Sequence, residues 1–209
     1  MKTTSCFLML VTFIFVGITG CYDSKTEKAF NYADDLQLAI ERFEQSRTDT
    51  SREVNEITEE VIKKLAEETP DLRWVAKSWE SEWRDVQGKY DKLVGDFSMV
   101  ATSSRSYFNQ LEQLANEIKN STIKAPEQEK NARLKTSWTE TFNQASKDIE
   151  KLSTLIKDGN DFHKVLIGAS LREKLVQNID DLKNISKRAQ ILLHDLEKLT
   201  IEGKKLTAN

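Results

Sequence analysis

The sequence predicts an all-α fold, an elongated antiparallel helical bundle in which four arms run up, down, up and down. Three observations support this prediction. Among 209 residues, 31% are charged and 38% hydrophobic, with only 7 glycines and 2 prolines, which is typical of long amphipathic helices. Apolar residues recur at alternating gaps of four and three, the spacing of coiled-coil-like heptad packing. Turn signals are few and far apart, and no alternating strand pattern occurs.

The first 20 residues have the pattern of a cleaved signal peptide, so that residues 21–209 form one domain. Lys2 precedes the apolar stretch CFLMLVTFIFVGI, which is shorter than the ~20 residues that a membrane-spanning helix needs. The four residues that end at Cys21 read Ile-Thr-Gly-Cys and resemble the lipobox of bacterial lipoproteins. That resemblance implies cleavage before Cys21 and acylation of this cysteine, with palmitate among the acyl chains. The alternative is an ordinary secretory signal that happens to precede a cysteine.

Lipidation of Cys21 would decide both the cysteine chemistry and the location of the protein. The other cysteine, Cys6, lies within the predicted signal peptide, so no thiol is left for a disulfide or for catalysis. In lipoproteins, aspartate directly after the acylated cysteine tends to retain the protein in the inner membrane, and here Tyr22 occupies that position. The resemblance therefore implies a cell-envelope protein anchored in the outer membrane. We expect it to face the periplasm, and exposure on the cell surface is the alternative. Its first partner is the membrane itself, through the acyl chains.

The first arm is expected over residues 25–68. Its apolar residues keep one helical phase on either side of a polar stretch at residues 46–51. This stretch permits two interpretations, a kink in one helix or a break between two helices. The apolar positions of the arm are Ala29, Ala33, Leu36, Ile40, Phe43, Val54, Ile57 and Val61.

The second arm is expected over residues 70–120 and has the most regular pattern. Thr69 and Pro70 predict a helix start, a capping residue followed by proline at the first helical position. Gly88 and Gly95 each weaken the helix by about 1 kcal/mol without ending it. One set of seam positions comprises Leu72, Trp79, Val86, Leu93, Val100, Tyr107 and Leu114, and the other Ala76, Trp83, Tyr90, Phe97, Ser104, Leu111 and Ile118.

The third and fourth arms are expected over residues 127–158 and 161–203. The apolar phase changes at residues 158–161, Asp-Gly-Asn-Asp, and a phase change at a Gly-Asn pair predicts a turn. The third seam comprises Trp138, Phe142, Ala145, Ile149, Leu152 and Ile156. The fourth comprises Leu171, Leu175, Leu182, Ile185, Ala189, Leu192, Leu196 and Leu199.

The unequal arms predict a two-helix tip over residues 54–86, at the end of the bundle far from Cys21. The second arm is roughly 75 Å long and the third roughly 48 Å, because a helix rises about 1.5 Å per residue. The tip would carry Trp74, Trp79 and Trp83. Tryptophan is favoured at binding hot spots, and Trp74, which is off the seam, is the best candidate for contact with a protein partner. The alternative is that tryptophans fill a wide core.

The sequence contains no catalytic motif, and we expect neither an enzyme nor a cofactor or metal site. No glutamate precedes His163 or His194 at the spacing of helical di-metal motifs. A formal net charge of −3 without a basic cluster argues against nucleic acid as a partner. Three polar residues interrupt the seams, Arg47, Ser104 and Asn178. They form either a buried polar site or isolated positions that control helix register.

The chain as a whole resembles a family of exported bacterial lipoproteins known only as an uncharacterised domain. The resemblance rests on the lipobox, on residues 22–29 and on residues 169–190, and it supplies no catalytic residues. We therefore expect a non-enzymatic, lipid-anchored scaffold, spacer or partner-binding module. The alternative is a carrier or sensor of a small apolar ligand, held between the helices near Ala76, Ala145 and Ala189. Regular heptad seams also permit a homo-oligomer.

Overall fold

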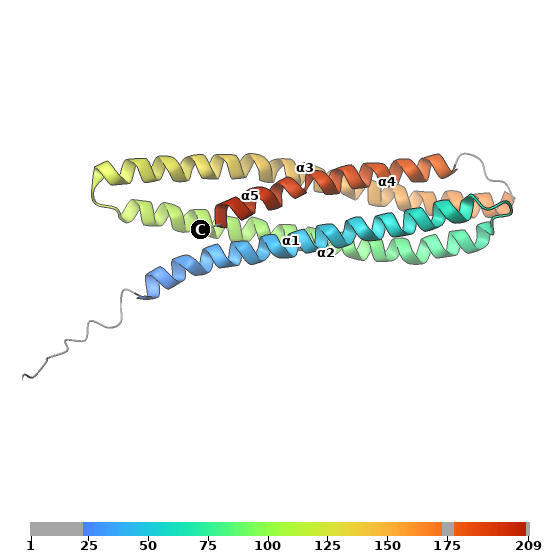
Figure 1. Cartoon of the computed structure of the whole chain (residues 1–209), viewed down its shortest axis with the longest axis horizontal. Coiled ribbons are helices and arrows are strands. Elements are labelled where there is room, and N and C mark those ends of the chain that lie inside the picture. Colours follow the sequence, from blue (N-terminus) through green and yellow to red (C-terminus); the bar gives the residue numbers. More distant parts are fainter. Residues whose placement is uncertain (1–22, 173–177, 208–209) are drawn as a thin grey trace, which may run out of the picture.

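The computed structural model describes residues 23–172 and 178–207, which form a long bundle of helices (Figure 1). The helices are α1 Asp23–Leu65, α2 Leu72–Glu117, α3 Ser121–Arg172, α4 Asn178–Asp195 and α5 Glu197–Thr207. The described residues contain no strand. The all-α prediction is therefore confirmed.

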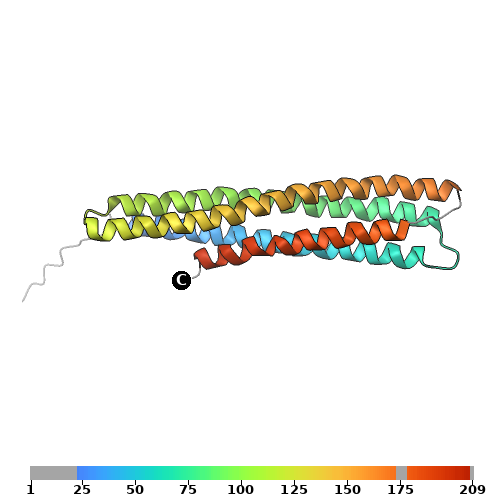
Figure 2. The ribbon, with the colours of Figure 1, turned by 90° about the horizontal axis from the view of Figure 1, so that it is seen from above.

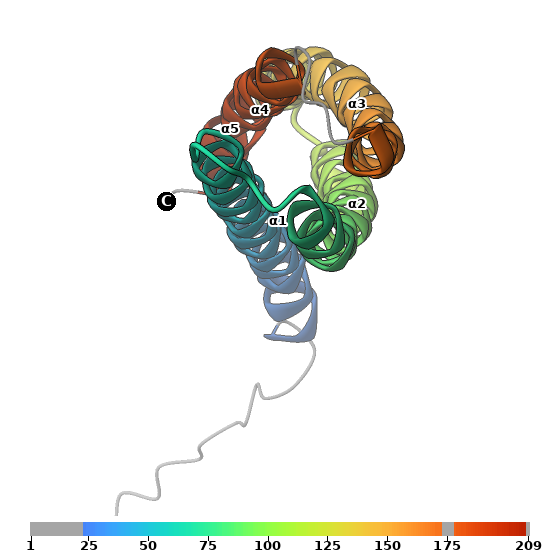
Figure 3. The ribbon, with the colours of Figure 1, turned by 90° about the vertical axis from the view of Figure 1, so that its right-hand side faces the viewer.

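The helices enclose a core on four sides, and α4 and α5 together make the fourth side (Figure 3). α2 packs against α1 and α3, while α4 and α5 each pack against both α1 and α3. Successive sides run in opposite directions along the long axis (Figures 1 and 2). This is the elongated up-down-up-down topology that the sequence predicts.

The heptad seam of α2 forms its buried face over most of the helix. The seam residues that are buried are Ala76, Trp79, Trp83, Val86, Leu93, Val100 and Ser104. Further along the core, the ring of Phe97 stacks on Phe142 of α3 at 4.6 Å between centroids and lies 5.9 Å from Phe43 of α1. These aromatic contacts tie three sides of the bundle together at one level.

α1 is one unbroken helix, which decides between the two interpretations of residues 46–51. Buried hydroxyls in this stretch bond within the helix: Ser46 Oγ donates to Phe43 O at 3.0 Å, and Thr50 Oγ1 donates to Ser46 O at 2.7 Å. A hydroxyl that bonds to the preceding turn can be buried without an unsatisfied polar group. The polar stretch therefore continues the helix.

α2 begins later than the sequence predicts, and near its C-terminal end different residues are buried. Asp71 is its N-cap, and Asp71 Oδ1 accepts a hydrogen bond from Trp74 N at 2.9 Å, so the helix starts after Pro70. Near the other end Phe108, instead of Tyr107, is buried, and Leu114 is exposed. Tyr107 Oη donates to Leu206 O at 3.1 Å, close to the last turn of α5. Beyond that level the described residues supply no fourth side of the bundle, so a narrower apolar face is sufficient.

The predicted turn at residues 158–161 is wrong. α3 begins at Ser121, contains Pro126, and passes through Gly159 to Arg172, a length of 52 residues. Gly159 is buried because the ring of Trp83 lies against its Cα, at a position that a side chain would occupy. The glycine thus permits close packing of two helices instead of a turn. The connection between α3 and α4 falls in residues 173–177, outside the described part of the chain.

Because α3 is so long, the predicted two-helix tip over residues 54–86 does not exist. Thr58 of α1 bonds to Ser186 of α4, with 3.1 Å between the hydroxyl oxygens, and Trp79 of α2 bonds to α3, so all four sides of the bundle are present there. An overhang occurs at the opposite end, where α1, α2 and α3 extend past α5 and where α2 and α3 meet at the turn of residues 118–120 (Figure 2).

The predicted fourth arm is shorter and is interrupted. It begins with α4 at Asn178 instead of residue 161, and α4 and α5 are separated at Leu196. In α4 the more buried residue is Leu193, next to the predicted seam position Leu192. Leu171 belongs to α3 and is 80% exposed. The predicted seam positions from Leu182 to Ala189, and Leu196 and Leu199, are buried, so the prediction is wrong at Leu171 and shifted by one residue at Leu192.

Candidate functional site

The predicted lipidation site, Cys21, lies outside the described residues, as does the predicted signal peptide of residues 1–20. The described chain starts with α1 at Asp23, two residues after Cys21. No helix in the described ranges combines the length and the apolar character needed to cross a membrane. Acylation of Cys21 stays a prediction, and the start of α1 is the nearest described point to it.

Trp79 and Trp83 are core side chains. Their rings stack at 4.6 Å with an interplanar angle of 13°, and Phe162 of α3 packs edge-on against Trp79 at 5.1 Å. Trp79 Nε1 donates to Gly159 O at 2.9 Å, and Trp83 Nε1 donates to Ile156 O at 3.1 Å. Both indoles are buried with their N–H groups paired, the usual arrangement of a core tryptophan. Neither ring is offered to a partner on the surface.

Trp74 is different, because 41% of its surface is exposed. Its position off the heptad seam is the reason that the sequence distinguishes it from Trp79 and Trp83. The ammonium group of Lys64, on α1, lies 5.4 Å from the centroid of the Trp74 ring, within the range of a cation–π interaction. α2 starts at the end of the bundle opposite the start of α1, so this indole lies far from Asp23 (Figure 1).

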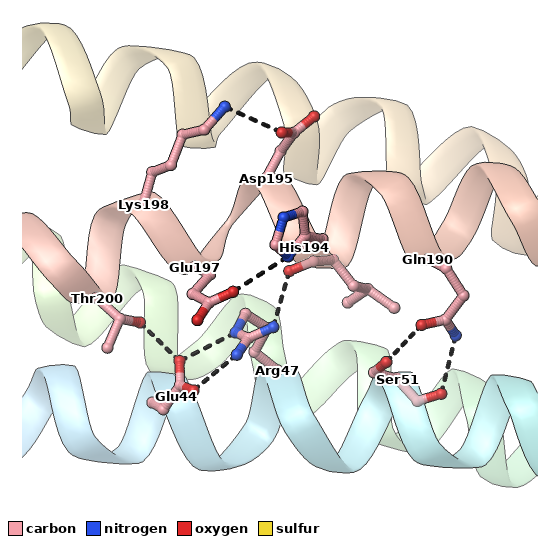
Figure 4. Close-up of polar contacts among 10 residues, drawn as sticks. Glu44, Arg47, Ser51, Gln190, His194, Asp195, Glu197, Lys198 and Thr200 are labelled. Atoms are coloured by element: carbon pink, nitrogen blue, oxygen red, sulfur yellow. Dashed lines mark hydrogen bonds and ion pairs between the residues drawn. The ribbon is translucent and has the colours of Figure 1, made fainter.

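The most extensive polar contact between helices joins α1 to the interruption between α4 and α5 (Figure 4). Arg47 Nη1 donates to Leu193 O at 3.0 Å, and Arg47 also makes a two-bond ion pair with Glu44, at 3.0 and 2.7 Å. Thr200 Oγ1 of α5 donates to Glu44 Oε2 at 2.8 Å. One glutamate–arginine pair of α1 therefore holds both α4 and α5.

The electrostatics of this contact favour the ionised form of Glu44. The hydrogen bond from Arg47 is the largest cause that lowers the pKa of Glu44, against the opposing effect of burial, and the Thr200 hydroxyl lowers it further. The Arg47 side chain is only 12% exposed, so its charge needs this partner. Since donors and acceptors satisfy one another, the arrangement acts as a structural connection between helices.

The sequence predicts only part of this contact. Arg47 is recognisable as a polar residue in an apolar seam, and Glu44 is one helical turn before it. Nothing in the pattern indicates Thr200 or the carbonyl of Leu193 as partners, because both lie about 150 residues away in the chain. Of the other two seam exceptions, Ser104 is buried and donates to Ala101 O at 3.2 Å within its own helix. The side chain of Asn178, the third exception, lies outside the part of the chain that the structure describes.

Two further polar pairs lie on the same α1–α4 interface. Ser51 Oγ donates to Gln190 Oε1 at 2.6 Å, and Gln190 Nε2 donates back to Ser51 O at 3.0 Å. Thr58 also bonds to Ser186 across this interface. Such matched pairs fix the axial register of two helices, since a shift by one residue leaves each partner unpaired. Both pairs have a structural role.

The histidines do not assemble a metal site in the described part of the chain. His163 Nε2 lies 4.0 Å from Glu80, and His194 Nδ1 lies 3.1 Å from Glu197. Residues 23–172 and 178–207 contain no group of three or more histidine, cysteine or carboxylate side chains that could hold a metal ion. Two carboxylates that the sequence did not single out, Asp96 and Asp148, are buried, and each is paired with a lysine of its own helix.

Two adjoining grooves run along the boundary of α2 and α3, in and next to the overhang. Their volumes are about 270 and 320 Å³. Phe108 and Lys135 line both grooves, and Trp138 and Phe142 line the one nearer the middle of the bundle. Of the three alanines expected to leave space for a ligand, Ala145 lines a separate surface groove between α3 and α5. Ala76 and Ala189 are buried in the bundle.

Comparisons with known proteins find no family model, no curated protein and no solved structure that matches this chain. The resemblance to exported lipoproteins therefore stays a prediction from the sequence.

Proposed function

We propose that this protein is a lipid-anchored helical bundle of the cell envelope that acts without catalysis as a spacer, scaffold or partner-binding module. The observation that carries the proposal is the segment Ile-Thr-Gly-Cys at the end of an apolar stretch, two residues before α1 begins. An anchor with two or three acyl chains binds a membrane stably, whereas a single chain is marginal. Tyr22 after the cysteine supports the outer membrane as the location.

The geometry of the described residues supports a mechanical role. Polar contacts join α1 to α4 and α5, as where Thr200 donates to Glu44 and Thr58 bonds to Ser186, and they hold these helices in one register. The exposed Trp74 lies at the end opposite α1's first residue, where it would face away from an anchored membrane. A stiff bundle held at one end presents its other end to a partner.

The anchor is tested with Cys21→Ser in the full chain. We expect the wild-type protein to incorporate labelled palmitate and to sediment with membranes, and the variant to lose both properties. Ser24→Cys in the Cys21→Ser background is the control, since it restores a thiol at a position outside the lipobox and should not restore the anchor. Membrane association of Cys21→Ser equal to that of wild type would contradict the proposal.

The partner contact is tested by placing a photo-crosslinking amino acid at position 74 in intact cells. We expect a specific crosslinked protein from position 74. The same probe at Ile191, which is exposed on α4, is the control and should not give this product. Crosslinks only between copies of this chain would favour a homo-oligomer, and no crosslink would favour a simple spacer.

A second candidate function is a carrier or sensor of a small apolar ligand. The grooves between α2 and α3 favour it, because Phe108, Trp138 and Phe142 are among the residues that line them and offer aromatic surface to an apolar ligand. Binding of a fluorescent apolar probe that is abolished by Ala101→Trp, a change expected to fill the groove lined by Trp138 and Phe142, would support this function. Probe binding that Ala101→Trp leaves unchanged would argue against it.

A further inference from the structure

The turn between α2 and α3 lies at the same level along the bundle as the start of α1. Phe43 of α1 meets Phe97 of α2 with 5.9 Å between ring centroids. From this contact α1 extends 20 residues back to Asp23 (43 − 23) and α2 extends 20 residues forward to Glu117 (117 − 97). Since both helices rise about 1.5 Å per residue, each covers about 30 Å to the same end. Figure 1 shows the first turn of α1 and the α2–α3 turn toward the same end of the bundle, separated from one another.

Only a short stretch of chain separates the predicted acylation site from the start of α1. Cys21 precedes Asp23 by two residues, which span at most about 7 Å whatever their conformation. The turn of residues 118–120 directly follows Glu117. Acyl chains on Cys21 would therefore bring residues 118–120 to the membrane surface when the bundle stands upright. α1 leans away from α2 and α3 at its start, so the anchor and the turn would be two separate points of contact (Figure 3).

The side chains at the turn have the character of a membrane-contacting surface. Ile123 is 54% exposed, and Leu114, one turn before the end of α2, is also exposed. Lys119 is exposed and Lys124 donates to Asn116 O at 3.0 Å, which keeps the turn closed. Residues 118–126 themselves contain no acidic residue, and Glu117 and Glu127 flank them. Lysines beside an exposed apolar side chain suit the boundary between anionic headgroups and acyl chains.

The opposite end of the bundle carries charges of both signs. Glu67, Glu68 and Asp71 lie there beside Lys63, Lys64 and Arg73. Chain length, not charge, therefore favours the α2–α3 turn as the end that meets the membrane.

We propose that the α2–α3 turn is a second membrane contact, in which Lys119 binds anionic lipid headgroups and Ile123 enters the interface. The inference rests on the proposed acyl anchor at Cys21. It also predicts how the bundle is oriented on the membrane. A single covalent anchor leaves the bundle free to tilt, whereas two contacts hold it upright with Trp74 away from the membrane.

The test uses the full-length acylated protein, purified and reconstituted in vesicles of phosphatidylethanolamine and phosphatidylglycerol. An environment-sensitive fluorophore is attached at Ser121→Cys, or at Thr69→Cys at the other end, and quenched by lipids with nitroxide-labelled chains. We expect quenching at position 121 and none above background at position 69. Lys119→Glu should lower the ratio of docked to undocked turns about fivefold or more, as should vesicles of phosphatidylcholine alone.

Matched substitutions separate a local contact from a general effect on solubility. Ile123→Asp should reduce quenching at position 121, whereas Leu171→Asp, at an exposed apolar residue near the other end of α3, should leave it unchanged. A membrane-bound protein with equal quenching at positions 121 and 69, or with none at 121, overturns the inference and leaves the anchor intact. A wild-type chain that is not acylated overturns the anchor, and this inference with it.

Discussion

Gly159 shows how a single missing side chain positions two helices. Trp83 occupies the space where the Cβ of any other residue would be, and its Nε1 reaches Ile156 O one turn earlier on α3. Trp79 bonds to Gly159 O itself. In sequence the pair Gly159–Asn160 is typical of a turn. The neighbouring indoles give the glycine another role, and those indoles are more than 70 residues away.

This explanation predicts opposite effects for the same substitution at two glycines. Gly159→Ala should lower the free energy of unfolding by about 2 kcal/mol, because the rigid indole of Trp83 must move to admit the methyl group. Gly88→Ala should raise it by about 0.5–1 kcal/mol, since nothing lies within 4 Å of the new Cβ and alanine favours the helix. Urea unfolding of the two variants measures both changes. Equal stabilisation by both substitutions would contradict the packing role of Gly159.

At the scale of helices, the interruption between α4 and α5 coincides with the polar contact from α1. Arg47 donates to Leu193 O near the end of α4, and Glu44 accepts from Thr200 near the start of α5. The hydrogen bonds thus reach both sides of Leu196. The heptad pattern predicts one continuous arm here because periodicity records which face is apolar, and an interruption of one residue hardly changes that face.

This contact predicts a dependence of stability on pH. Because the folded pKa of Glu44 is lowered, its contribution is fully present above the ordinary glutamate value of 4.5 and is lost as pH falls through the lowered value. Glu44→Gln should therefore destabilise the protein by about 1 kcal/mol at neutral pH, allowing for partial exposure, and by less in acid. Unfolding in urea at a series of pH values measures this difference.

Glu60→Gln is the control, because Glu60 lies on the exposed face of the same helix. The free energy of unfolding of the Glu60→Gln variant should equal that of wild type at every pH. If the curves of wild type and Glu44→Gln ran parallel from neutral pH into acid, the ionised pair would not be the source of the stabilisation.

The whole molecule is a rod because one helix, α3, extends along its full length. Its 52 residues correspond to about 78 Å at 1.5 Å per residue. α1 and α2 pair over most of that length, and α4 with α5 completes the fourth side except at the overhang. The unequal ends follow from where α5 stops, near Tyr107.

Small-angle X-ray scattering tests this shape on the chain from Tyr22 onward. We expect a radius of gyration of about 24 Å for a monomeric rod 78 Å long and about 20 Å wide, against about 16 Å for a compact domain of this size. The scattering mass separates a monomer from a homo-oligomer. A monomer with a radius of gyration near the compact value would contradict the rod.

The sequence by itself determined the properties that depend on neighbours within a helix. Heptad spacing identifies the all-α class, the buried face of α2 from Ala76 to Ser104, and the exposure of Trp74 in contrast to Trp79 and Trp83. These are local, since side chains three and four residues apart share a face whatever lies opposite. The lipobox at Cys21 and the anchoring function that it implies also come from the sequence and stay predictions.

Only the tertiary structure decided where the helices end and which polar groups meet. Residues 158–161 continue α3 because Trp79 and Trp83 pack on Gly159, and residues 46–51 continue α1 because their hydroxyls bond within the helix and to α4. Glu44 of α1 pairs with Thr200 of the neighbouring α5, and α1, α2 and α3 extend past the end of α5. Each outcome depends on contacts between residues far apart in the chain. The heptad pattern records only which residues of one helix share a face, so it does not indicate these contacts.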